Sequence, residues 1–483
     1  MHVPRVAVSR FLPALLLLAA LANMALAQAA QPPAAPAQGE KQSLTATPAE
    51  EPELFSEEWF ADSRKPVDWL TWGADLRLRD EYFNNAITLN KEVPAHEWHF
   101  QRYRPRIWST ITPVQDLDFN SRLTWEFRNW CLPKGIRGTS LEDRRSMEWD
   151  EALFDTLNVK WSNMLDRPAT LTVGRQDIIL DDGWLVLEGT PLDGSRTIFF
   201  DAARLNYNFE QAKTVVDLIY IEQSANTDQW IEPFNDQERL VVEQDQRGAI
   251  LHVANKSLEK TELDGYFIFQ KNLAENYVGG VESNIYAFGG RIAGAMDDHW
   301  KYRAELAQEL GHKNYEDLCA LGFNSRLSYF VNDKLNNNFR LAYEFLSGDD
   351  PDTDTIEEFD PLWGRWPQWS DLIVYTYAPE TRIAYVTNLH RLGAGWSFNP
   401  TKKLEMCTDY HLLFADENTR AGQAGYTNSG DFRGQLVTAQ LRYTINPHIK
   451  GHLTGDLFCP GNYYDATKND TAVYLRYELV FTW

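Results

Sequence analysis

The stretch Thr-Ala-Val-Tyr-Leu-Arg-Tyr-Glu-Leu-Val-Phe-Thr-Trp, residues 471–483, decides the fold. Apolar side chains occupy every second position, and the positions between them include Arg476 and Glu478. This alternation predicts a β-strand with one apolar and one polar face. Such a strand, with the aromatic Trp483 on its apolar face, is typical of the closing strand of a bacterial outer-membrane barrel, where one face meets lipid and the other a wet lumen.

Upstream stretches alternate in the same way, and together they predict about eighteen strands. One clear example places Trp300, Tyr302, Ala304 and Leu306 on the outward face, whereas 213–222 and 247–255 alternate less cleanly. Tight connections, such as 113–115 and 446–448, alternate with long ones. The long connections are 84–97, 131–147, 180–196, 225–245, 347–384 and 416–431. The sequence therefore predicts an all-β fold, a transmembrane antiparallel β-barrel with short periplasmic turns and long extracellular loops.

The first part of the chain predicts export. Arg5 and Arg10 precede an apolar stretch at 11–22, and Ala25-Leu26-Ala27 forms a small-residue cleavage site, so residues 1–27 are expected to be a signal peptide. Residues 28–68 are expected to be a largely disordered periplasmic leader, and residues 69–483 the barrel. The mean hydropathy of −0.45 agrees with a barrel, in which only alternate residues meet lipid. The expected location is the bacterial outer membrane.

Basic residues dominate the predicted inward face, although the whole chain has a net charge of −23. A lumen lined by arginine and lysine favours anions, and the planar guanidinium suits carboxylates. The predicted pore-lining and substrate-binding cations are Arg77, Arg79, Arg102, Arg104, Arg106, Arg122, Arg128, Lys160, Arg204, Arg291, Arg303, Arg340, Arg442 and Arg476. Lys301, Arg326, Arg391 and Lys450 share this face.

The alternative is structural, because inward ladders of arginine and glutamate stiffen a barrel whatever it transports. The triple Arg102, Arg104 and Arg106 on one strand favours transport, since like charges at alternate positions repel unless each has an acidic partner. Inward acids for such pairs include Glu81 and Glu126.

No cofactor is expected. The long loop at 347–384 carries the cluster Asp349, Asp350, Asp352 and Asp354, whose oxygens could hold a divalent cation. The spacing lacks the glycine and distal glutamate of an EF-hand, so a solvated acidic loop, or one bridged to lipopolysaccharide by divalent ions, is the simpler interpretation.

Several short segments resemble the bacterial alginate export protein family. The first runs Val173-Gly174-Arg175-Gln176, then Asp181-Asp182-Gly183-Trp184 and Phe200-Asp201-Ala202-Ala203-Arg204-Leu205. Others are Tyr343-Glu344-Phe345-Leu346-Ser347-Gly348-Asp349 and Gly455-Asp456-Leu457-Phe458-Cys459-Pro460-Gly461-Asn462-Tyr463. The resemblance implies an eighteen-stranded barrel that secretes alginate through an arginine-rich pore.

The resemblance also implies roles for three residues. Arg175 would line the constriction, with Asp181 and Asp182 as acidic partners folded in from an outer loop. Strict alternation places Arg175 outward, so this role requires a bulge or bend near Gly174. The chain departs from the family at the very short turn after Ile445, where the resemblance implies a long periplasmic loop.

Four functions remain open at this stage. The first is a non-enzymatic conduit that exports an acidic exopolysaccharide such as alginate, alongside periplasmic secretion proteins. The second is a porin that takes up small anions such as organic or sugar acids. A hydrolase would need a serine beside His252, His390, His411 or His452, and none of these stands in a recognisable nucleophile motif. An adhesion barrel with a blocked lumen is the fourth.

Overall fold

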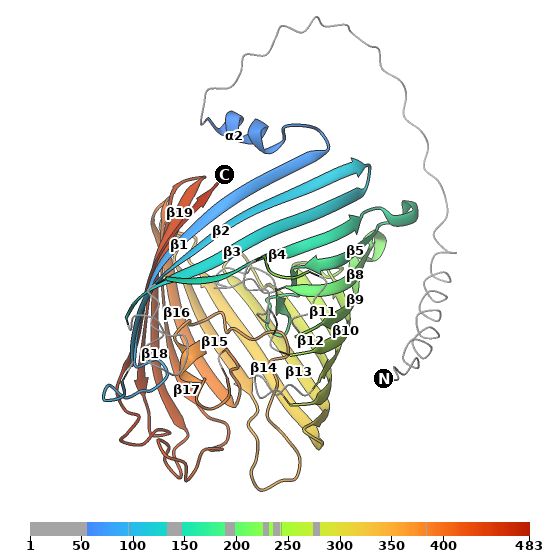
Figure 1. The fold of residues 1–483 in the computed structure, drawn as a ribbon. Coiled ribbons are helices and arrows are strands. Elements are labelled where there is room, and N and C mark those ends of the chain that lie inside the picture. The colour runs from blue at the N-terminus through green and yellow to red at the C-terminus, as the bar shows by residue number, and fades with distance from the viewer. Residues whose placement is uncertain are drawn as a thin grey trace, which may run out of the picture. The chain divides into compact units, whose positions relative to one another are not determined.

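Alternating apolar and polar residues form long strands in the computed structural model, which describes residues 56–94, 96–132, 147–188, 199–225, 231–234, 242, 244–273, 281–382 and 384–483. Eighteen strands form one sheet (Figure 1). They are β1 (Leu70–Asn84), β2 (Glu97–Val114), β3 (Leu117–Leu132), β4 (Met147–Trp161), β5 (Ala169–Gln176), β8 (Phe200–Phe209), β9 (Thr214–Gln223), β10 (Gln246–Asn255), β11 (Thr261–Asn272), β12 (Ser283–Ala295), β13 (Trp300–Lys313), β14 (Glu316–Phe330), β15 (Asn338–Leu346), β16 (Leu389–Thr401), β17 (Leu404–Phe414), β18 (Phe432–Asn446), β19 (Ile449–Pro460) and β20 (Ala472–Thr482).

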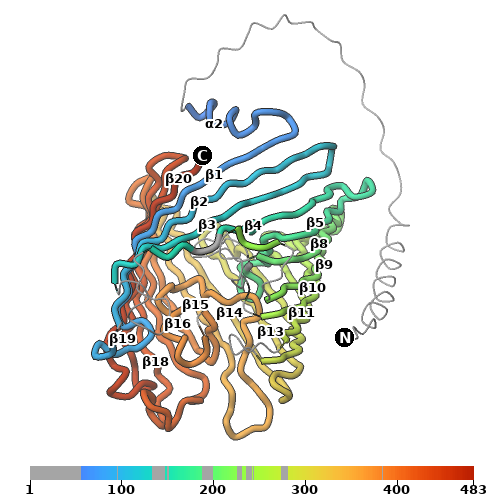
Figure 2. The backbone as a smooth tube through the Cα atoms, viewed as in Figure 1, coloured from blue at the N-terminus to red at the C-terminus, as the bar shows by residue number. Residues whose placement is uncertain are grey.

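The sheet closes on itself, because β1 pairs with β20 as well as with β2 (Figure 2). Each strand of the sheet is antiparallel to its neighbour in sequence, and β5 pairs with β8 across the small hairpin of β6 (Ile178–Ile179) and β7 (Leu187–Glu188). Closure leaves the sheet without an unpaired edge, as a membrane-spanning sheet requires. The predicted fold class and strand number are confirmed.

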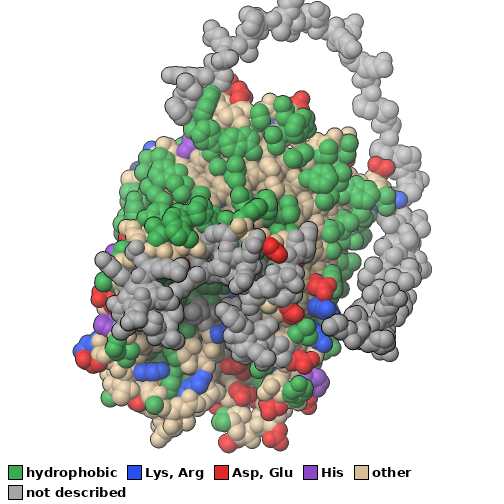
Figure 3. Space-filling view, viewed as in Figure 1, with side chains coloured by type: hydrophobic (Ala, Val, Ile, Leu, Met, Phe, Trp, Pro, Cys, Tyr) green, Lys and Arg blue, Asp and Glu red, His purple; other side chains and the backbone are tan. Residues whose placement is uncertain are grey.

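The quoted stretch forms β20 with the predicted faces. Leu475 and Tyr477 are 51% and 45% exposed, whereas Arg476 and Glu478 are buried. At the closing seam Glu478 lies opposite Arg79, so opposite charges meet on the inner face. The same alternation around the ring gives the barrel an apolar outer surface, which Figure 3 shows as hydrophobic side chains over the strands.

Connection lengths differ between the two ends of the barrel (Figure 1). At one end, turns such as 115–116 between β2 and β3 and 447–448 between β18 and β19 are very short. At the other end, connections such as 347–388 are long, and the one between β13 and β14 is an exception of two residues. We call these the short-turn end and the long-loop end. In the described residues, no helix is both long enough and apolar enough to cross a membrane.

Residues 57–64, which the sequence placed in the leader, form helix α2 (Glu57–Arg64). The Ser56 hydroxyl caps it by accepting from the backbone N–H of Trp59 at 3.1 Å. Trp59 and Phe60 then pack against Trp483, with ring centroids 5.2 and 5.3 Å away. The helix therefore contacts the short-turn end, beside the end of β20.

The main hydrophobic core lies inside the barrel. Apolar inward residues of the strands, such as Ile219 and Ile250, pack against two segments that fold into the lumen. The hairpin segment comprises residues 177–188 and contains β6 and β7. The crossing segment comprises residues 347–388, with 383 not described, and contains the short helix α3 (Ile373–Thr376). The sequence predicted a long extracellular loop at 347–384, but most of the crossing segment is folded into the lumen.

Candidate functional site: the lumen

The arginines nearest the closing seam are buried in ion pairs. Arg77 contacts Glu126 at 3.2 Å, Arg79 contacts Glu478 at 2.6 Å, and all four of these side chains are at most 8% exposed. Arg102 lies 3.4 Å from Glu81 and 3.5 Å from Glu126. These groups form the wall beneath the lumen surface, and buried charges of this kind need their partners to offset desolvation.

The triple on β2 therefore does not act as one open stripe. Arg102 and Arg104 are 4% and 6% exposed, and Arg102 has two acidic partners. Arg106 is held by both carboxylate oxygens of Asp75 and is more exposed. An arginine with an acidic partner has a structural role on the wall. Arg102 and Arg106 both have such a partner, so the structural interpretation holds for these two residues.

A basic cavity opens near Arg106, at the short-turn end of β2 to β5 and β8. It has a volume of about 650 Å³ and is lined by Arg106, Trp108, Thr110, Asn120, Ser121, Arg122, Thr156, Asn158, Lys160, Thr170, Thr172, Gln176, Asp177, Arg204 and Asn206. Arg122 pairs with Asp155 at 2.7 Å and with Asp177 at 2.9 Å. Lys160 has no acidic partner within the described residues, so its charge is available to a solute. We call this the first basic cavity.

Trp108 is the one aromatic side chain in that lining. Its indole lies against Gly73 of β1, where an added Cβ atom would come within 2.5 Å of the ring. Glycine at this position therefore lets the indole lie flat on the wall. Alternation from Arg106 predicts that Trp108 faces inward, but no motif marks it as a binding residue, so its role was not predicted from the sequence.

A second basic cavity of about 600 Å³ lies at the short-turn end of β10 to β14. Its charged lining residues are Lys256, Lys260, Glu262, Arg291, Lys301, Arg303 and Arg326. Arg326 is exposed to this cavity and has no carboxylate within 4 Å among the described residues. Arg291 and Arg303, in contrast, both contact Asp182, at 3.0 and 2.6 Å.

Arg175 is buried at the end of β5, and its neighbour Gln176 lines the first basic cavity, whereas Arg175 does not. Gly174 has φ +119°, which turns the chain, and a Cβ atom there would lie 2.4 Å from the carbonyl oxygen of Leu157. The guanidinium is 1% exposed, contacts Asp201 at 3.0 Å and lies 3.8 Å from the ring centroid of Phe199. The backbone therefore turns at Gly174, and the role of Arg175 at a constriction stays a prediction.

The remaining predicted cations lie elsewhere on the inner wall. Arg204 pairs with Asp217 at 2.7 Å, and Arg340 is held by Asp409 at 3.0 and 3.1 Å. The others are Arg128, 3.9 Å from Glu126; Arg442, 3.2 Å from Glu405; and Arg476, 2.9 Å from Asp371. The predicted cations are thus spread around the whole circumference of the barrel and do not converge on one constriction.

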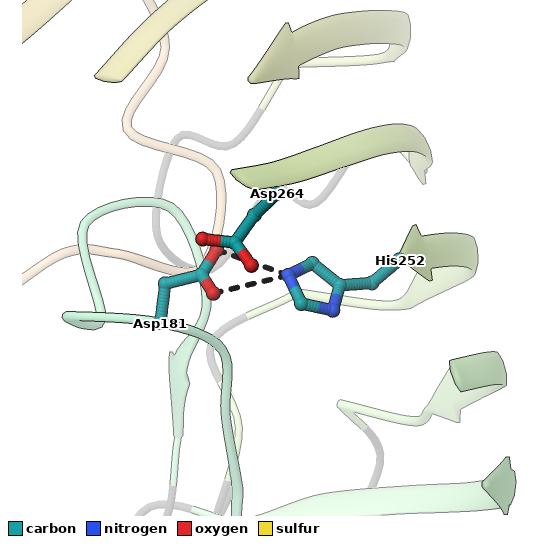
Figure 4. Close-up of side chains that lie close together, drawn as sticks. All are labelled: Asp181, His252 and Asp264. Atoms are coloured by element: carbon teal, nitrogen blue, oxygen red, sulfur yellow. Dashed lines mark hydrogen bonds and ion pairs between the residues drawn. The ribbon is translucent and has the colours of Figure 1, made fainter. Parts of the chain in front are cut away.

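The hairpin segment is tied to the wall by its two aspartates. Asp181 meets Nε2 of His252 at 3.0 Å, and Asp182 meets Arg291 and Arg303 (Figure 4 shows the first contact). Burial disfavours the charged form of Asp182, but the two arginines outweigh this effect and hold its pKa below the ordinary value.

The crossing segment contacts opposite sides of the ring. Trp363 donates from Nε1 to Gln246 of β10 at 3.1 Å, whereas Asp371 pairs with Arg476 of β20. In the closed order of eighteen strands, β10 and β20 lie about half-way round from each other. The segment therefore spans the lumen between these two walls.

Backbone hydrogen bonds join the two segments. Val186 and Trp363 form a parallel bridge, in which the N–H of Trp363 donates to Leu185 at 3.1 Å. Trp184 also stacks on Phe359 with ring centroids 5.6 Å apart. The lumen between the two cavities and the long-loop end is thus narrowed by one connected assembly.

The acidic cluster at 349–354 does not converge on a common point. Asp349 accepts from the backbone of Glu357 at 3.1 Å, and Asp350 accepts from that of Asp352 at 2.9 Å, which are turn contacts. Within the described part of the chain, the side chains close enough to share a metal ion are instead Asp181, His252 and Asp264.

Comparison with known proteins gives two results. The family described as alginate export matches the chain over residues 68–478. No curated protein matches it.

Solved structures with the same fold include proteins of Pseudomonas aeruginosa, among them the outer-membrane protein OprD. OccK8 (OprE) superposes with a TM-score of 0.54 at 12% identity, covering 85% of this chain and 98% of that one. OpdQ gives 0.52 at 13% identity, covering 85% and 98%, and OprD gives 0.51 at 11% identity, covering 85% and 94%. At these identities the likeness establishes the fold.

Proposed function

Because the chain belongs to the alginate export family, we propose that it is an anion-selective channel that exports an acidic exopolysaccharide such as alginate. Family and fold are those of a bacterial outer-membrane channel, a class of proteins that passes solutes without catalysis.

The single observation that carries the proposal is the first basic cavity. Lys160, which has no acidic partner among the residues that the structure describes, offers a cation to a carboxylate. Trp108 offers a flat apolar face to the C–H groups of a sugar ring. The amides and hydroxyls around them, among them Asn120 and Asn158, are donors and acceptors for sugar hydroxyls. An acidic sugar carries all three kinds of group, whereas a small inorganic anion would use only the cation.

The position of both basic cavities supports export. They lie at the short-turn end, which is the periplasmic end by the expected asymmetry of outer-membrane barrels. A polymer made inside the cell enters from that side, so its carboxylates would meet Lys160 and Arg326 first. Passage then requires sites strong enough to admit the anion and weak enough to release it. The neighbouring carboxylates, such as Asp177, limit how tightly a uronate is held.

One observation favours the alternative, an uptake porin for small anions. The crossing segment narrows the lumen, so in this conformation a small organic acid passes more readily than a polymer chain. Export of a polymer therefore requires the crossing segment to move.

The test is conductance of the refolded barrel in planar lipid bilayers under a salt gradient, with oligouronates or small organic acids added from either side. We expect anion selectivity, block by oligouronates from the short-turn end, and a severalfold loss of selectivity in Lys160→Glu. Lys402→Glu, in the exposed turn between β16 and β17, is the matched charge reversal and should retain selectivity. Trp108→Ala should weaken oligouronate block and leave ion selectivity in place.

Three outcomes would contradict the proposal. They are cation selectivity of the wild-type channel, equal loss of selectivity in Lys160→Glu and Lys402→Glu, and block by small acids alone. The last outcome would favour the uptake porin.

A further inference from the structure

The place where the hairpin segment meets the wall has the geometry of a metal site. Asp181 of the hairpin segment, His252 of β10 and Asp264 of β11 each offer one ligand atom, and these atoms lie within 4.8 Å of one another (Figure 4). We propose that Asp181, His252 and Asp264, the triad, bind a divalent transition-metal ion, with Zn²⁺ as the fitting ion, and that the ion locks the hairpin segment to the barrel wall.

The ligand types and spacing fit Zn²⁺. Carboxylate oxygen and imidazole nitrogen are both ordinary Zn²⁺ ligands, and bonds of about 2.0–2.2 Å in a tetrahedron separate ligand atoms by roughly 3.3 Å. Nε2 of His252 lies 3.0 and 3.1 Å from the two oxygens of Asp181. This separation is close to the ligand spacing of a tetrahedral ion, so an ion bound between the two groups would need little movement of either side chain. Three protein ligands leave the fourth position for water.

A second observation points to the same place. Asp264 is 7% exposed, and one of its oxygens, Oδ2, is taken by Arg291 at 2.6 Å. The other oxygen, Oδ1, is buried and has no hydrogen-bond partner. An unpartnered buried carboxylate oxygen is costly, and a cation beside it removes that cost.

The consequence would be metal-dependent closure. Asp181 belongs to the segment that folds into the lumen, whereas His252 and Asp264 belong to adjacent strands of the rigid wall. An ion bound by all three stabilises the inward position of the hairpin segment, because it binds that arrangement and not the released one. This inference does not depend on which solute the channel passes.

Metal content is the first measurement. The purified full-length protein is stripped with chelator, given Zn²⁺, desalted and analysed by mass spectrometry for bound metal, with Mg²⁺ in excess as a competitor. We expect one Zn²⁺ per chain, and at least about tenfold weaker binding in Asp181→Asn and His252→Gln. Asp182→Asn is the matched control for loosening of the hairpin segment, because it removes the ion pairs with Arg291 and Arg303 but keeps all three ligand side chains of the triad.

A second readout separates a ligand from a merely structural residue. Each variant is first shown to be folded by its heat-modifiable mobility on a gel. Zn²⁺ should then lower single-channel conductance in the wild type, and chelator should restore it, with neither effect in Asp181→Asn. The proposal is overturned if the wild type binds no Zn²⁺ in the presence of Mg²⁺, or if Asp181→Asn binds as well as the wild type. Equal losses in Asp181→Asn and Asp182→Asn would also overturn it, since the cause would then be displacement of the segment.

Discussion

Replacing Trp363 by alanine tests whether the crossing segment closes the lumen. The indole is 2% exposed, fits over Gly248 of β10 and donates its N–H to Gln246. Its backbone is bridged to Val186 of the hairpin segment. One side chain therefore joins the crossing segment, the hairpin segment and the wall.

The size of the effect follows from this burial. Truncating a buried tryptophan to alanine costs roughly 3–5 kcal/mol, through lost transfer free energy and the cavity left behind. Released from the wall, the crossing segment would expose residue 363 to water, so most of this cost falls on the closed arrangement. At 1.4 kcal/mol per power of ten, the ratio of open to closed channels should rise by roughly 10²- to 10³-fold. The barrel ladder does not involve Trp363, so the strands should remain paired.

Two assays measure the release. In planar bilayers, Trp363→Ala should spend far more time in a high-conductance state than the wild type. Limited trypsin digestion should cut it faster within the crossing segment, at Arg365 or Arg382. Trp161→Ala is the control, because Trp161 is 39% exposed on the outward face of β4. Unchanged conductance in Trp363→Ala, or an equal change in Trp161→Ala, would refute the closing role of the crossing segment.

Two further predictions concern backbone and charge. Gly174→Ala places a side chain at a positive φ and against the backbone of β4. It should therefore displace Arg175 and lower the free energy of unfolding by roughly 1–3 kcal/mol, measured by urea titration. An unfolding midpoint equal to that of the wild type would contradict this account. The pKa of Asp182 is lowered, so at any pH above the ordinary carboxyl pKa near 4 its ion pairs stabilise the closed lumen fully. This stabilisation is lost as the pH falls through the lowered pKa. Conductance recorded from pH 7 to pH 3 should therefore rise at the acid end in the wild type, with a smaller rise in Asp182→Asn.

The strands were predictable because lipid on one side and polar lumen on the other impose a period of two, as β20 displays. The exceptions are local changes of that period. At Gly174 the positive φ turns the backbone beside Arg175, whose side chain is buried. On β4 the register with β3 shifts between Arg122 and Leu123, and Asp155, at that irregularity, contacts Arg122. A glycine or a bulge can reset alternation anywhere along a strand, and periodicity alone does not reveal which ones do.

The inward fold of the crossing segment had a signal in its composition. Phe359, Trp363, Leu372 and Ile373 are too apolar for a solvated outer loop, and all four are at most 2% exposed. Length and turn residues predicted a loop, but the hydrophobic content predicts burial, and in a barrel the place to bury it is the lumen. The ion pairs that anchor the segment depend on which strands face each other across the ring, which no sequence pattern specifies.

Burial divides the lumen cations into two kinds with different physical effects. Arg77, Arg79 and Arg102 are shielded by their partners, so a solute meets their charge only as a field weakened by adjacent carboxylates. Lys160 and Arg326 have no such partner among the described residues and face open cavities. Selectivity should therefore respond far more to changes at the two accessible cations than to changes at the seam, although the seam holds more arginines. Reversing a seam charge would instead leave buried carboxylates unpaired, so its effect should be on folding of the barrel.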